Sequence, residues 1–181
     1  MQKEHRVHGF ISDGYGKRYL IFWLYFVLGD LKGANAYLRW YEKTFSDDIG
    51  EPIQKLCTAI LLHRSDKQQK AKYLLADLML SNLYTIPRLL GEKCERFKIE
   101  CSSNFEGAEY VEEIPNKILS AITDEDRAWI RELHESFEFQ RYKKQYIELR
   151  QRLDKTHSVE NRSPIVDELG LILKDLKNGC S

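Results

Sequence analysis

The 181-residue sequence is poor in cysteine and proline, with four of each, and it has no surplus of either charge. The cysteines have neither the close paired spacing of a zinc site nor the density of a disulfide-rich domain, so we expect reduced thiols and no metal site. The 28 basic and 28 acidic side chains cancel. This balance argues against a nucleic-acid partner, because a phosphate backbone attracts a clustered excess of Lys and Arg. The four cysteines are Cys57, Cys94, Cys101 and Cys180.

Long hydrophobic runs are also lacking. The longest, from Tyr19 to Leu28, has about half the length that a helix needs to cross a membrane. The first residues show no apolar segment followed by a small-residue cleavage site. We therefore expect no membrane partner and a cytoplasmic protein, in which the Tyr19 to Leu28 run is a helix covered on most sides.

Apolar residues at three- and four-residue spacing do occur along most of the chain, which is typical of amphipathic helices. The sequence thus predicts an all-α protein with a loose leader over 1–16 and a single helical domain over 17–181. Within that domain we expect helical hairpins over 17–91, an irregular surface excursion over 92–114 and a C-terminal helical layer over 115–181. The expected helices are 17–28, 32–44, 53–64, 67–81, a short turn within 82–91, a short helix after Pro115, 124–136, 137–153 and 164–177.

Two equal spacings suggest a repeat in the first half of the chain. Ala36 and Ala71 are 35 residues apart, and so are Pro52 and Pro87. Twelve residues before these alanines stand Leu24 and Ala59, where the paired helices of each unit would have to approach closely. We therefore assign Leu24, Ala36, Ala59 and Ala71 to helix contacts.

With these spacings, residues 17 to 91 resemble the tetratricopeptide repeat family, which has units of about 34 residues, small residues at the helix contact and a proline near the end of each unit. Gly29, Ala36, Tyr37, Ala59 and Ala71 fit this pattern, whereas Leu24 replaces the usual small residue. The resemblance implies stacked helical hairpins.

The same resemblance implies a concave surface formed by the first helix of each hairpin, where an extended peptide or a helix can bind. We therefore expect a non-catalytic interaction or scaffold module with a protein or peptide partner, unless the protein's own C-terminal helices fill the groove. The surface would be more apolar than charged, which disfavours a clamp for a peptide carboxylate. Its expected residues are Arg18, Ile21, Tyr25, Leu28, Leu56, Ile60 and His63.

Motifs for catalysis or cofactor binding are weak. The fragment Gly14-Tyr15-Gly16-Lys17 lacks the further glycine at position 11 and the Ser or Thr at position 18 of a phosphate-binding loop. No Gly-x-Ser-x-Gly motif occurs, and the acidic pairs at 47–48 and 112–113 precede proline-led helix starts, where carboxylates oppose the helix dipole. We therefore predict no catalytic residues and no cofactor.

Two alternatives stay open. One is an enzyme with a site in the 93–111 segment beside Asn82, Tyr84 and Arg88, because irregular segments on rigid scaffolds often carry function. The other is a self-assembling subunit or homodimer that uses the strongly amphipathic seam from Phe139 to Leu153.

Overall fold

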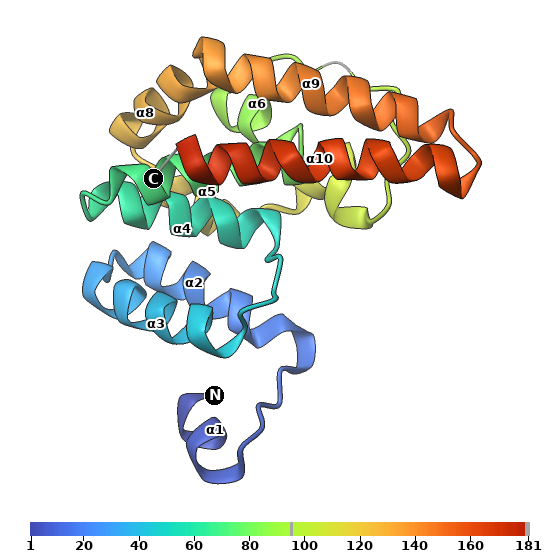
Figure 1. The fold of residues 1–181 in the computed structure, drawn as a ribbon. Helices are drawn as coiled ribbons and strands as arrows, with labels where there is room; N and C mark the ends of the chain where they lie inside the picture. Colours follow the sequence, from blue (N-terminus) through green and yellow to red (C-terminus); the bar gives the residue numbers. More distant parts are fainter. Residues whose placement is uncertain (95, 180–181) are drawn as a thin grey trace.

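The computed structural model describes residues 1–94 and 96–179, and Figure 1 shows helices joined by short turns and by several longer loops. No strand occurs among the described residues, so the all-α prediction is confirmed. The α-helices are α1 Gln2–His8, α2 Lys17–Leu28, α3 Leu31–Thr44, α4 Pro52–Arg64, α5 Gln68–Ser81, α6 Thr85–Leu90, α7 Asn116–Ala121, α8 Asp124–Glu135, α9 Phe137–Asp154 and α10 Val159–Gly179, and the 3-10 helices are η1 Gly14–Gly16, η2 Asn104–Glu106 and η3 Ala108–Glu113.

The predicted hairpins correspond to the successive pairs α2–α3 and α4–α5, with α2 packed on both α3 and α4. Gly29 ends α2 at a φ of 65°, which favours glycine, and the Asp30 side chain then caps α3 by accepting a hydrogen bond from the Gly33 amide at 2.8 Å. The first helices of the two pairs begin 35 residues apart, at Lys17 and Pro52, but the second helices begin 37 apart, at 31 and 68.

This difference corrects two of the predicted helix contacts. Ala71 and Ala59 are fully buried as expected, but Ala36 is exposed and Ala34, at 4 % exposure, takes the contact position in α3. Leu24 is 61 % exposed, so it does not occupy a buried contact position between helices. The equal alanine spacing was therefore misleading, because α4 and the connection that follows it are each one residue longer than α2 and its connection.

The N-terminal leader also differs from expectation, since it contains α1 and η1. Gly9 ends α1 in the left-handed region at a φ of 73°, and the Gly9 amide donates to the His5 carbonyl. The His5 ring contacts Trp40 of α3 edge-on, with 6.4 Å between ring centroids.

Helix α4 is the centre of the core. Every residue from Pro52 to Leu62 is buried, because α2 and α5 pack on α4 and the 3-10 segment η3 contributes buried Tyr110 and Val111 to the same cluster. A second cluster lies between α2 and α3, where the Phe22 ring contacts Tyr37 and Tyr41 at centroid distances of 4.9 and 5.1 Å.

The C-terminal helices cover α5. Figure 1 shows α9 and α10 side by side, and α10 contacts both α5 and α9. The apolar stripes of both helices pack into the main hydrophobic core of the same chain. The buried stripe residues are Phe139, Tyr142 and Leu149 of α9 and Ile165, Ile172 and Leu176 of α10.

Helix α10 begins at Val159, five residues before the predicted start at Pro164. The Ser158 hydroxyl accepts from the Asn161 amide at 3.4 Å, which caps the helix early, so Pro164 lies inside the helix. Cys180, one of the four cysteines of the sequence, lies outside the described part of the structure.

Thr123 and Asp126 form a reciprocal cap at the start of α8. The Thr123 hydroxyl accepts from the Asp126 amide at 3.2 Å, and the Asp126 carboxylate accepts from the Thr123 amide at 2.8 Å. Asp126 also pairs with Arg64 at the end of α4, so this cap ties the two halves of the chain together. Among the described helices, none combines the length and the apolar character needed to cross a membrane.

Candidate functional site: a cleft over α4 and α5

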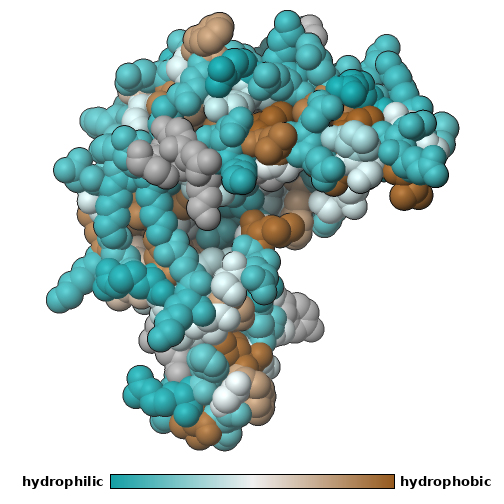
Figure 2. All heavy atoms as spheres, in the orientation of Figure 1, coloured by the Kyte–Doolittle hydropathy of each residue, from teal (hydrophilic) through white to brown (hydrophobic). Residues whose placement is uncertain are grey.

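A cleft of about 500 Å³ opens where two irregular segments overhang α4 and α5, and Figure 2 shows a hollow between the N-terminal helices below and the C-terminal helices above. This volume lies within the usual range of small-molecule and peptide pockets. We call it the α4–α5 cleft. Its lining residues are Ser46, Asp47, Asp48, Ile49, Gly50, Pro52, Lys55, Tyr73, Asp77, Leu80, Ser81, Ser103, Phe105, Glu106 and Tyr146.

The first wall of the cleft is the 46–50 loop, which is fixed by Asp48. Its carboxylate accepts hydrogen bonds from the hydroxyls of Tyr19 and Tyr41 at 2.7 and 2.9 Å and from the Gly50 amide at 3.0 Å. The Arg18 guanidinium pairs with it at 2.9 Å. Burial opposes ionisation of Asp48, but these donors and Arg18 outweigh it and lower the pKa of the carboxyl.

This arrangement corrects the predicted role of Asp48. The carboxylate serves as an acceptor for two tyrosines and an arginine, whereas the N-cap position of α4 is occupied by Glu51, whose side chain makes no capping hydrogen bond. One result is that Ile49 projects from a fixed loop at 84 % exposure.

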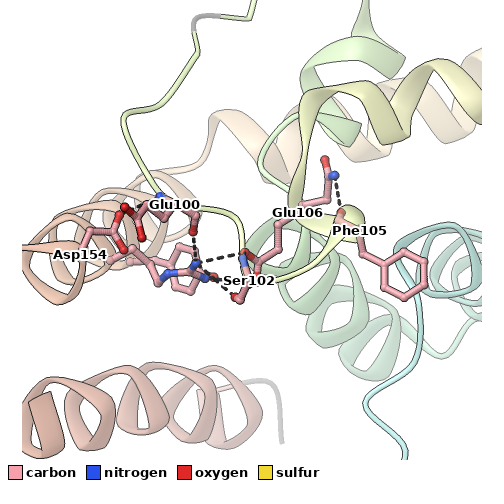
Figure 3. A network of polar contacts seen from close by, with 8 residues as sticks. Glu100, Ser102, Phe105, Glu106 and Asp154 are labelled. Carbon is pink, nitrogen blue, oxygen red and sulfur yellow. Dashed lines mark hydrogen bonds and ion pairs between the residues drawn. The ribbon is translucent and has the colours of Figure 1, made fainter. Parts of the chain in front are cut away.

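The opposite wall belongs to the 92–114 segment, which Arg150 of α9 fixes. The Arg150 guanidinium bonds to the Glu106 carboxylate at 3.0 and 3.2 Å, to the Glu100 carbonyl at 2.8 Å and to the Tyr146 hydroxyl at 2.9 Å. Figure 3 shows Glu100, Ser102 and Glu106 directed toward this guanidinium. Burial opposes ionisation of Glu106, but Arg150 and Ser102 outweigh it and lower the pKa of the carboxyl.

Asn82 holds the same segment from the other side. Its amide nitrogen donates to the carbonyls of Phe105 and Gly107 at 2.7 and 3.1 Å, while its side-chain oxygen accepts from the Tyr84 and Thr85 amides, both at 2.9 Å. The predicted irregular excursion is thus tied to both α9 and the end of α5. Its Phe105 side chain remains 38 % exposed at the cleft.

The floor of the cleft carries a buried lysine. The Lys55 ammonium pairs with Asp77 at 2.9 Å and donates to the Ser81 hydroxyl at 2.6 Å, and its side chain is 7 % exposed. A Ser and Lys pair can act as nucleophile and base only when the amine is neutral. Here the Lys55 ammonium is paired with the Asp77 carboxylate, and Ser81 donates its proton to the Asp77 carbonyl at 2.7 Å.

The described residues were also compared with the requirements of a metal site. In the part of the chain that the structure describes, no group of three or more His, Cys, Asp or Glu side chains is placed to hold a metal ion. Cys57 is fully buried in the core, and burial raises the pKa of its thiol.

The predicted concave face does not form one open surface. Leu56 and Ile60 are fully buried in α4 and are inaccessible, because α2, α5 and η3 cover that helix. His63 stacks on Trp129 with ring centroids 4.2 Å apart, and Arg18 is committed to Asp13 and Asp48.

The remaining predicted residues lie on α2. Ile21 and Tyr25 are half-buried beside the aromatic cluster, whereas Leu28 is 76 % exposed. Of the seven residues named from the sequence, Leu28 is therefore the one with a largely open side chain.

The residues behind the enzyme alternative have structural partners. Asn82 is buried under the 105–107 backbone, the Tyr84 hydroxyl accepts from the Phe97 amide at 3.2 Å, and Arg88 pairs with Glu112 at 3.1 Å. The seam from Phe139 to Leu153, proposed for self-assembly, faces the interior of the same chain, with Phe139 fully buried. That seam is not available to a second subunit.

Comparison of the chain with protein-family models, with curated proteins and with solved structures found no match. The tetratricopeptide-like assignment therefore stays a prediction.

Proposed function

We propose that this protein is a non-catalytic binding module that holds an extended peptide segment of a partner protein in the α4–α5 cleft. The observation that carries the proposal is a pair of exposed apolar side chains, Ile49 and Phe105, on two irregular loops that line one cleft. Exposed apolar groups on fixed loops lose little conformational entropy on binding, which favours recognition.

Both loops are pre-organised by half-buried ion pairs, Arg18 with Asp48 and Arg150 with Glu106. The succession of two hairpins supports the same class of function, since tetratricopeptide-like scaffolds bind peptides. In this proposal, however, the peptide site is the cleft and not the face formed by the first helices.

Charge indicates which peptides fit. The lining contains the carboxylates of Asp47, Asp48, Asp77 and Glu106 against a single ammonium, Lys55. Pairing with Arg18 and Arg150 neutralises part of this charge, and Asp47 remains exposed at the mouth. The preferred segment therefore combines an aliphatic or aromatic anchor with a neighbouring Lys or Arg.

Selection of peptides from a displayed random library on the purified protein tests the proposal. We expect enriched peptides that share an apolar anchor beside a basic residue. Affinity for a synthetic copy should fall at least about tenfold in the Ile49→Asp and Phe105→Asp variants, because each change places a carboxylate against the apolar anchor.

Phe137→Asp is the matched control, because Phe137 is 83 % exposed and does not line the cleft. It should leave the affinity unchanged. Peptides that bind the Ile49 and Phe105 variants as tightly as the parent protein would place the binding surface elsewhere.

A further inference from the structure

Helix α2 is apolar on two opposite faces. Phe22 and Phe26, at 0 % and 1 % exposure, point into the core. The face directly opposite, which we call the α2 stripe, consists of Leu20, Leu24, Val27 and Leu28, at exposures of 39, 61, 40 and 76 %. These residues follow the steps i, i+4, i+7 and i+8, so they form one continuous ridge along the helix.

From this ridge we infer that the α2 stripe is the interface of a homodimer, in which α2 packs antiparallel on α2 of a second copy about a twofold axis at Leu24. A symmetric interface requires a self-complementary surface. In this register Leu24 meets Leu24 of the other copy, and Leu20 meets Leu28, so every large stripe side chain finds an apolar counterpart.

The charges at the two ends of α2 fit this antiparallel arrangement. Lys17 lies on the same helix face as the stripe, one turn before Leu20, and α2 has no acidic residue in its first turn. Lys17 is exposed, and so is Asp30 just beyond the other end of the helix. The antiparallel pairing brings Lys17 of one copy beside Asp30 of the other, twice by symmetry, and supplies an acidic group to each N-terminus of α2.

The available area also suits a second copy. The exposed parts of the stripe amount to about 400 Å² of apolar surface per copy, against the roughly 800 Å² that each partner contributes to a standard interface. Since somewhat more than half of such an interface is apolar and the rim is polar, the stripe supplies most of the apolar centre, and the side chains around it supply the rim.

Sedimentation or light scattering of the full chain over a range of concentrations tests the dimer. We expect a concentration-dependent dimer whose dissociation constant rises at least about tenfold in Leu24→Glu, because two carboxylates then meet at the twofold axis. Leu171→Glu is the matched control, because Leu171 is 55 % exposed on α10, and it should leave the dimer intact. A monomer at all concentrations, or a dimer indifferent to Leu24→Glu, overturns the inference.

Cross-linking tests the antiparallel register independently, in a chain whose Cys94, Cys101 and Cys180 are replaced by serine. Under mild oxidation, two copies of the Leu24→Cys variant should become joined by a disulfide between their introduced cysteines. When the Leu20→Cys and Leu28→Cys variants are mixed, a disulfide should join one chain of each variant. The Leu20→Cys variant alone should form no disulfide-linked dimer. Self-linkage of Leu20→Cys with no mixed product would indicate a parallel pair and overturn the proposed geometry.

Discussion

A carboxyl group at the start of α4 makes the stability of this protein depend on pH. Glu51 is half-buried, and its Oε1 atom finds no hydrogen-bond partner among the described residues. Burial, opposed only by the neighbouring Trp23 indole, raises the pKa of Glu51 from 4.5 to about 7. Two neighbouring groups, Cys57 and Tyr110, are affected by the charge of Glu51. Burial raises the pKa of each group, and repulsion from the Glu51 carboxylate raises it further.

The sign of the effect follows from proton binding. Between pH 4.5 and about 7 the folded state holds a proton on Glu51 that the unfolded state has released, so the free energy of unfolding falls as the pH rises through this range. A shift of this size corresponds to at most about 3 kcal/mol, and because the side chain is partly exposed, solvent screening reduces it to about 1–2 kcal/mol. Above about pH 7, this contribution of Glu51 to the free energy of unfolding is completely lost.

The Glu51→Gln variant removes the titration while keeping the size of the side chain. We expect it to be about 1–2 kcal/mol more stable than the parent protein at pH 8, and to lose most of that advantage at pH 5. Urea denaturation at both pH values measures the difference in free energy of unfolding between the variant and the parent protein. The titration of all other groups is common to both proteins and cancels in this difference. Glu132→Gln, at an exposed position of α8, is the control and should change little at either pH. An advantage of equal size at pH 5 and pH 8 would refute the assigned titration.

Two further predictions concern the helix contacts and the 92–114 segment. Ala59→Leu should destabilise the protein by about 1–3 kcal/mol through overpacking. Ala36→Leu, on the exposed side of α3, should change the stability by no more than about 0.5 kcal/mol. Equal effects of the two variants in thermal denaturation would contradict the corrected helix contacts. Arg150→Met should leave the Glu106 carboxylate half-buried and unpaired, destabilising by about 1–3 kcal/mol and speeding proteolysis within residues 96–104. An unchanged digestion rate would show that Arg150 does not hold this segment.

The sequence was sufficient for the helices because their signals are local. Periodic apolar residues and caps such as Thr123 act within a few residues, and the structure places helices close to the expected boundaries. One error arose where a distant partner decides the outcome, and another arose where a second local signal competed with the predicted one. The exposure of Ala36 depends on how α3 rotates against its neighbours, and the early start of α10 depends on a weak hydroxyl cap at Ser158 in place of the stronger proline signal.

The cleft could not be predicted in the same way, because residues from five separate segments form it: the 46–50 loop, α4, α5, residues 103–106 and α9. Arg150 and Glu106 are 44 positions apart, and no local pattern links them. One signal was present in the sequence. Lys55 stands among apolar residues in a helix that is otherwise suited to the core, and a lysine in such a position requires a charged partner. The structure supplies Asp77, which lies one helix later, at the cleft floor.

The α2 stripe shows the opposite relation between sequence and structure. Its composition predicts a helix covered on most sides, yet one whole face is open within the single chain. The C-terminal helices do not cover it. Helix α10 packs on α5 and α9, and α7 contacts α2 while leaving Leu24 and Leu28 exposed. Because exposing aliphatic side chains to water is unfavourable, the proposed association with a second copy would bury side chains that the single chain leaves open.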